Sequence, residues 1–151
     1  MRKLVLLAFL CFACFSQLKA QKSIEWADLS DVAWKRGYVK ALGGYYDIAH
    51  FGKSVEALNH REVTIKGFYV PIDMEGTIFA LSKSPSTMCF FCGTGGIETV
   101  MEIFVKKGHK SLKRVKADKY IEIKGTLVLN RDNPEHLMYL LKNAELVQIL
   151  K

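Results

Sequence analysis

The stretch Val63-Thr64-Ile65-Lys66-Gly67-Phe68-Tyr69-Val70-Pro71 predicts a long β-strand, because β-branched and aromatic residues dominate it. A second stretch repeats this plan around the same Ile-Lys-Gly core: Ile121-Glu122-Ile123-Lys124-Gly125-Thr126-Leu127-Val128-Leu129. A glycine inside a strand indicates a bulge or a sharp bend. Two long strands that bend at a glycine are typical of a small barrel, in which such bends let the sheet turn its corners.

The remaining segments predict shorter elements around these two strands. Strands are expected at 78–81, 97–105 and 144–150, and length and β-branching favour a strand over a helix for the second of them. A short helix is expected within 48–59, and Asn133-Pro134-Glu135 predicts the start of another one. The pattern therefore predicts a mainly β fold: a small OB-like barrel of five or six strands, with a short C-terminal helix and an N-terminal arm.

The beginning of the chain is not expected to belong to the folded domain. Arg2 and Lys3 precede an apolar run over 4–15, and Ala20 is the expected cleavage point of a secretory signal peptide over 1–20. The residues before Cys14 make a poor lipobox, so lipoprotein anchoring is disfavoured. The protein is therefore expected to be exported, to the periplasm or the extracellular space, and the processed chain carries a net charge of about +4.

The rest of the 151-residue chain has a length that suits one domain. Residues 21–46 are expected to form an ordered, extended arm that Gly37, Gly43 and Gly44 interrupt, and residues 47–151 the OB-like β-barrel domain. The arm holds Trp26 and Trp34, which are expected to anchor it to the barrel because large aromatic side chains usually serve packing.

The segment Cys89-Phe90-Phe91-Cys92-Gly93 stands apart from the strands. Its C-x-x-C-G order resembles a zinc knuckle, in which the glycine lets backbone N–H groups approach the thiolates. Thiolates favour zinc or copper(I) over calcium or magnesium. Two sulfurs make an incomplete site, so further ligands are expected from Glu98, His50 or His109. In an oxidising compartment, a disulfide between Cys89 and Cys92 is an alternative to metal binding. Phe90 and Phe91 would offer an apolar surface to a partner.

These residues predict an accessory or binding protein that holds or hands over zinc or copper. An enzyme is disfavoured, because no Ser-His-Asp order, phosphate loop or pair of catalytic carboxylates is readable. Two alternatives stay open: a thiol-disulfide redox protein that uses Cys89 and Cys92, and a partner-binding OB module without metal.

A basic segment over 106–119 carries seven Lys and Arg residues against the single Asp118. OB folds often bind single-stranded nucleic acid, but export and the lack of aromatic residues in this segment argue against a nucleic-acid partner. A solvated loop or a contact with an anionic membrane surface is the expected role.

Several motifs together resemble a known family, and they cover most of the processed chain. They are Ile24-x-Trp26, Asp31-Val32-x-Trp34, Lys66-Gly67-Phe68-x-Val70-Pro71, the cysteine segment followed by Glu98, Lys124-Gly125-x-Leu127-x-Leu129-Asn130, and His136-Leu137-Met138-Tyr139. These motifs resemble the DUF3299 family, secreted bacterial proteins of the Bacteroidota type. The resemblance implies an OB-like domain that accompanies a membrane transport or envelope protein, in some relatives linked to metal supply. It implies no established activity.

Overall fold

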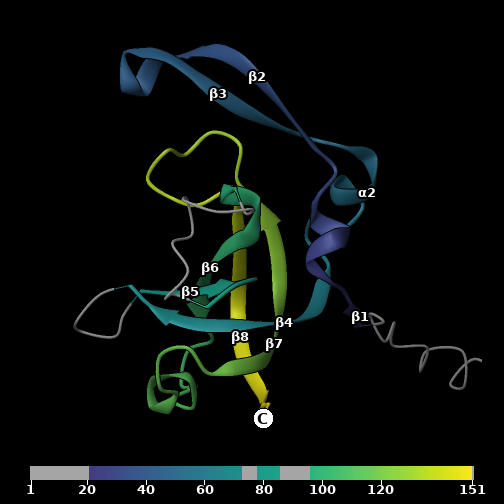
Figure 1. Cartoon of the computed structure of the whole chain (residues 1–151), viewed down its shortest axis with the longest axis vertical. Helices are drawn as coiled ribbons and strands as arrows, with labels where there is room; N and C mark the ends of the chain where they lie inside the picture. The colour runs from purple at the N-terminus through teal and green to yellow at the C-terminus, as the bar shows by residue number, and fades with distance from the viewer. Residues whose placement is uncertain (1–20, 73–77, 86–95, 151) are drawn as a thin grey trace, which may run out of the picture.

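The computed structural model describes residues 21–72, 78–85 and 96–150. Within this part of the chain, five strands close into a barrel (Figure 1). They are β4 (Glu62–Pro71), β5 (Phe79–Ser82), β6 (Val100–Val105), β7 (Tyr120–Leu129) and β8 (Tyr139–Ile149).

The order of the strands identifies the type of barrel. β4 pairs with β5, β5 with β6, β6 with β8 and β8 with β7, and β7 returns to β4. The β6–β8 pair is parallel and the other barrel pairs are antiparallel. This is a five-stranded Greek-key barrel of the OB type. The prediction of a mainly β, OB-like barrel is therefore confirmed, and β1 (Lys22–Ser23) adds a sixth strand, parallel to β4.

The two glycines of the repeated Ile-Lys-Gly core lie where neighbouring backbone comes close. A Cβ on Gly67 would lie 2.7 Å from the carbonyl oxygen of Ser82, and a Cβ on Gly125 would lie 2.8 Å from that of Lys142. The register between β7 and β8 shifts between Lys124 and Thr126, which places an irregularity at Gly125. Any larger residue would push the adjacent strands apart at these two points.

The core fills the barrel and extends under its loops. Alternate residues of β4 and β7 point inward, including the fully buried Ile65 and Ile123. The basic segment after β6 contributes Leu112, in the short 3-10 helix η4 (Leu112–Arg114), together with Val115. The basic segment is therefore attached to the core by two apolar side chains, while its lysines are exposed.

The N-terminal part is more elaborate than an extended arm. The 3-10 helix η1 (Trp26–Leu29) leads into a hairpin of β2 (Val32–Val39) and β3 (Gly44–Phe51), joined by η2 (Lys40–Leu42). The hairpin forms a separate two-stranded sheet, and α2 (Lys53–Glu56) then returns the chain to the barrel. Figure 1 shows the hairpin reaching across one end of the barrel. Trp26 packs against the core as expected, whereas Trp34 lies on the hairpin and is exposed.

The short C-terminal helix expected from Asn133 is not formed, and residues 130–138 make a loop of turns between β7 and β8. The side-chain amide of Asn130 donates to the carbonyls of Asn133, His136 and Leu137, and its oxygen accepts the N–H of Asn133. Asn133 in turn accepts the N–H of Glu135. These side-chain bonds satisfy the backbone groups that a helix would use, so the turn is favoured over the helix.

No helix in the described ranges has the length and apolar character needed to span a membrane.

Candidate functional site

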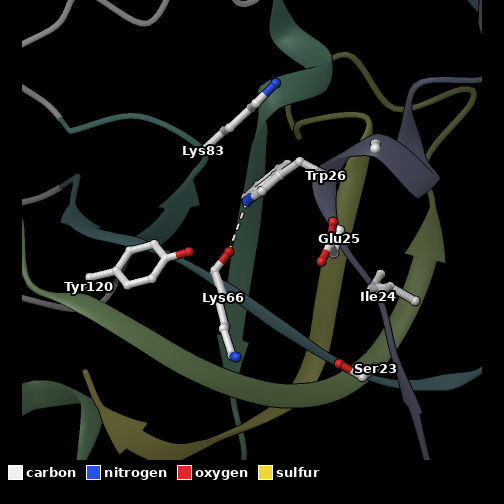
Figure 2. A pocket seen from close by; sticks show the side chains of 8 residues that line it. Ser23, Ile24, Glu25, Trp26, Lys66, Lys83 and Tyr120 are labelled. Atoms are coloured by element: carbon white, nitrogen blue, oxygen red, sulfur yellow. Dashed lines mark hydrogen bonds between the residues drawn. The ribbon is translucent and has the colours of Figure 1, made fainter. Parts of the chain in front are cut away.

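The edge of β4 explains how the N-terminal segment attaches to the barrel. β5 is short and pairs with β4 only from Phe68 onward, so the first half of β4 lacks a long neighbour on that side. Ile24 N–H donates to the carbonyl of Thr64 at 2.9 Å, and the indole Nε1–H of Trp26 donates to the carbonyl of Lys66 at 2.8 Å (Figure 2). The segment thus satisfies edge carbonyls that would otherwise need water.

This attachment leaves a groove between the N-terminal segment and the outer face of the barrel. The cavity has a volume of about 420 Å³. Its lining comes from four separate parts of the chain: Ser23, Ile24, Glu25, Trp26, Ala27, Lys66, Lys83 and Tyr120. A second hollow of about 590 Å³ continues from it, because Lys83 and Tyr120 line both. Both volumes lie in the range of about 300–1,000 Å³ that is usual for small-ligand sites.

Aromatic rings and ammonium groups dominate the groove. Tyr120 stands opposite Phe68 in the β4–β7 register, and their ring centroids are 4.9 Å apart, so Phe68 supports the exposed tyrosine ring. Lys83 and Lys66 also line the groove, and Figure 2 shows that the carbonyl of Lys66 faces the Trp26 indole whereas its ammonium group points away from the ring. Lys119 adds a further cation to the second hollow. Such a site offers flat apolar faces for stacking and positive charge for an anion.

Carboxylates in the two hollows limit this positive character. Glu25 lines the first hollow, and Asp118 lines the second. A carboxylate beside aromatic rings can accept hydrogen bonds from ligand hydroxyl groups. The groove is thus equipped for a ligand that carries both acidic and hydroxyl groups.

A second polar cluster lies on β6 and the loop 130–138. Glu102 is buried, and both of its carboxylate oxygens lie 3.0 Å from Nδ1 of His136. The backbone N–H of Leu137 donates to the same carboxylate at 3.3 Å. The pair therefore fastens the loop to the barrel wall. Sequence reasoning missed it, because 34 positions separate the two residues and no local spacing relates them.

The predicted cysteine site lies outside the described residues. This holds for Cys89 and Cys92, for Phe90 and Phe91 between them, and for the cleavage residue Ala20. The base of the β5–β6 connection that contains the cysteines is described, and there the N–H of Lys83 donates to the carbonyl of Thr99 at 2.9 Å.

The three additional ligands that were expected do not gather in one place. Glu98 lies in the 3-10 helix η3 (Ile97–Thr99), directly before β6. His109 follows the other end of β6, and its Nε2 lies 3.1 Å from Oε2 of Glu145. A six-residue strand spans roughly 17 Å, which separates Glu98 from His109. His50 is exposed on β3. Among the residues that the structure describes, no group of three or more His, Cys, Asp or Glu side chains could hold a metal ion.

Glu98 does influence one buried group. Burial raises the pKa of the Tyr139 hydroxyl well above its usual range, and the negative charges of Glu98 and Asp31 raise it further. The neutral hydroxyl donates to the carbonyl of Leu29 at 2.5 Å and so ties η1 to β8. Tyr139 is therefore a structural hydrogen-bond donor, held in its protonated form.

No protein-family model matches the chain, and no curated protein matches it. Among solved structures, the chain is similar to the crystal structure of a DUF3299 family protein from Pseudomonas aeruginosa PAO1. The two are 14% identical with a TM-score of 0.46, and the likeness covers 86% of this chain and 95% of the other. This neighbour bears the name of the family that the sequence motifs resemble, and the likeness assigns no activity, ligand or partner to this chain.

Proposed function

We propose that the chain is an exported binding protein, and that the groove beside Trp26 holds an acidic oligosaccharide. The observation that carries this proposal is that Trp26, Tyr120, Lys66 and Lys83 line one cavity. OB-type barrels bind oligosaccharides and oligonucleotides on their outer faces. An exported protein meets acidic polysaccharides more readily than nucleic acid, which favours the sugar.

The proposed contacts follow from the chemistry of the lining. The flat apolar face of a sugar ring would stack on Trp26 or Tyr120, since aromatic side chains supply large rigid contact areas. Carboxylate groups of the sugar would pair with the ammonium groups of Lys66 and Lys83, since both residues line the cavity. Glu25 would accept hydrogen bonds from sugar hydroxyl groups. Because the lysines are exposed, binding is expected to weaken as salt is added.

Calorimetric titration with galacturonate oligomers tests the proposal, with neutral galactose oligomers as the uncharged control. Lys83→Gln is expected to weaken galacturonate binding about tenfold, since losing one charge-assisted contact costs roughly 1.4 kcal/mol. Lys107→Gln removes the same charge after the end of β6 that lies away from Lys83, and it should leave binding unchanged. Equal affinity for charged and neutral oligomers, or equal loss in both variants, would contradict the proposal.

A metal function is the second candidate, and the chemistry of Cys89 and Cys92 supports it. Two thiolates with few further ligands suit the transfer of zinc or copper to a membrane transport or envelope protein better than permanent storage. The position of Glu98 at the base of the same connection favours it over His109 as a third ligand. Native mass spectrometry of the exported protein tests this. One bound metal should be lost in Cys89→Ser/Cys92→Ser and weakened in Glu98→Gln.

The thiol-disulfide alternative predicts a different result for the same residues. A redox protein would reduce insulin with turnover, and Cys89→Ser would abolish that turnover. A binding protein would show none. A metal-free protein with a closed Cys89–Cys92 disulfide, which takes up neither zinc nor copper after reduction, would end the metal proposal and leave the groove proposal untouched.

A further inference from the structure

A further hollow lies between the β2–β3 hairpin and the loop 130–138, with a volume of about 290 Å³. The hairpin forms one wall, the loop forms the opposite wall, and Ile97 of η3 also lines the hollow. Figure 1 shows the loop at the end of the barrel that the hairpin crosses. The volume lies at the lower end of the range that is usual for small-ligand sites. This hollow shares no lining residue with the groove beside Trp26, so the two can bind ligands independently.

Two aromatic side chains of the hairpin line this hollow without being buried. Trp34 comes from β2 and Tyr46 from β3, and they are 44% and 46% exposed. Neither of them packs against the barrel core, in contrast to Val32 and Phe51 at the base of the hairpin. Their ring faces are therefore available to a ligand.

Two carboxylates line the same hollow from opposite walls. Asp47 belongs to β3, and Asp132 belongs to the loop 130–138. Asp47 lies two residues before Ala49, which stands opposite Trp34, so Asp47 and Trp34 share one face of the ribbon. Arg36 stands opposite Asp47 but forms no ion pair with it. Within the described ranges neither carboxylate takes part in a hydrogen bond or an ion pair, so both are available to a cationic ligand.

The positive groups that line the hollow are engaged elsewhere. The guanidinium of Arg131 pairs with Glu56 and lies over the Phe51 ring, 5.6 Å from its centroid. The Nδ1 atom of His136 is held by the buried carboxylate of Glu102. No lysine lines this hollow in the described part of the chain, although Lys and Arg outnumber Asp and Glu by 22 to 15 in the whole sequence. The free charges in the hollow are therefore negative.

Aromatic rings beside carboxylates suit a substituted ammonium ion. The negative face of a ring attracts the cation, and a carboxylate adds a second electrostatic attraction. A primary ammonium group is strongly hydrated and would need three hydrogen-bond acceptors in place of its water, whereas a quaternary one needs none. The methyl groups of a quaternary ion also pack against apolar side chains, and Leu42, Ile48 and Met138 line the same hollow. The lining therefore favours the quaternary form.

We propose that the hollow between the hairpin and the loop 130–138 binds a small quaternary ammonium compound. The methylated nitrogen lies against the rings of Trp34 and Tyr46. The carboxylates of Asp47 and Asp132 attract it from the two walls. Because both walls take part, the ligand connects the outer part of the hairpin to the loop that closes the barrel end.

Calorimetric titration with choline tests the proposal, with neohexyl alcohol as the uncharged isostere. Choline chloride replaces sodium chloride at constant ionic strength, so that screening does not change during the titration. Choline is expected to bind saturably below about 10 mM, and neohexyl alcohol at least about tenfold more weakly. Ethanolamine, the primary amine of the same backbone, is also expected to bind more weakly than choline because its ammonium group stays hydrated.

Substitutions in the two walls test the residues. Asp47→Asn and Asp132→Asn should each weaken choline binding about fivefold, the factor expected for one exposed charge contact. Trp34→Leu should weaken it by at least a similar factor, because a ring face is lost. Glu135→Gln is the matched control, since it removes an exposed carboxylate of the same loop that does not line the hollow. The asparagine variants are isosteric and change exposed residues, so their Tm should match that of the wild type.

Four results would overturn the proposal. Choline would show no saturable binding, or the uncharged isostere or ethanolamine would bind as tightly as choline. Alternatively, both asparagine variants would bind choline as the wild type does, or Glu135→Gln would lose as much binding as they do.

Discussion

Replacing Tyr139 by phenylalanine should destabilise the protein by removing a single buried hydrogen bond. The hydroxyl donates to the carbonyl of Leu29, and both residues are fully buried. Taking a donor away from a buried carbonyl costs about 1–3 kcal/mol. We therefore expect Tyr139→Phe to lower the free energy of unfolding by about 2 kcal/mol, which lowers the Tm of a domain of this size by about 6–10 °C.

The same variant should change how stability depends on alkaline pH. The pKa of Tyr139 is raised in the folded protein, first by burial and then by the carboxylates of Glu98 and Asp31. In the unfolded chain tyrosine titrates near its usual value of about 10, so the unfolded state loses this proton first as the pH rises. The resulting stabilisation is complete below about pH 10 and is lost above it. Tyr139→Phe has no hydroxyl to titrate and lacks this loss. The difference in the free energy of unfolding between wild type and Tyr139→Phe should therefore shrink as the pH rises.

Urea unfolding of both proteins, followed by circular dichroism between about pH 8 and about pH 11, measures the deficit and its change. Tyr120→Phe is the matched control: it removes a hydroxyl from an exposed tyrosine and should change stability by less than about 0.5 kcal/mol. Equal stability of Tyr139→Phe and wild type, or a deficit that stays constant across this pH range, would refute the reasoning.

Two further predictions concern other parts of the barrel and the hairpin. Gly67→Ala would place a methyl group 2.7 Å from a backbone oxygen of β5 and should lower the free energy of unfolding by about 1–3 kcal/mol. Gly37→Ala would meet only the flexible end of the Ile48 side chain and should lower it by less, which chemical denaturation of both variants measures. The pKa of Glu145 is lowered chiefly by its hydrogen bond with Lys106, so its stabilising contribution is lost as the pH falls through the lowered pKa. Lys106→Gln should raise that pKa toward its usual range, and an NMR titration that shows no rise would count against the ion pair.

The barrel could be predicted from sequence because its signals are local. The stretches 63–71 and 121–129 alternate or cluster β-branched residues strongly enough to define two long strands, and the structure places β4 and β7 there. Gly67 and Gly125, which occupy the same place in the repeated Ile-Lys-Gly core, further indicated bends in these strands, and the structure shows the backbone of a neighbouring strand close to each glycine. A closed barrel could be inferred because glycines inside long strands let a sheet curve enough for its first and last strands to pair.

The hairpin was not predicted, although its pattern is present in the sequence. Gly37, Gly43 and Gly44 looked like interruptions of an extended arm. In the structure Gly43 adopts a φ of 64° and closes the turn, so this glycine marks the centre of a hairpin. The loop after β7 was mistaken for a helix because Asn133-Pro134 is an equally good start for either, and only the side-chain bonds of Asn130 decide between them.

The groove could not be predicted from sequence. Trp26, Lys66, Lys83 and Tyr120 are spread over most of the chain, and only the closed barrel and the attached N-terminal segment bring them together. The cysteine pair is the opposite case: its chemistry is readable from five consecutive residues, while its surroundings lie outside the described ranges.

The way in which the N-terminal segment joins the sheet also makes it exchangeable. It is held to β4 through few hydrogen bonds, among them those from Ile24 and the Trp26 indole. If a protease removed residues 21–26, the carbonyls of Thr64 and Lys66 would face solvent as an open sheet edge. An extended peptide, or the same segment from another copy, could then add itself as a strand in the vacated place. Trimming a few residues would thus convert a self-contained barrel into an acceptor for foreign strands.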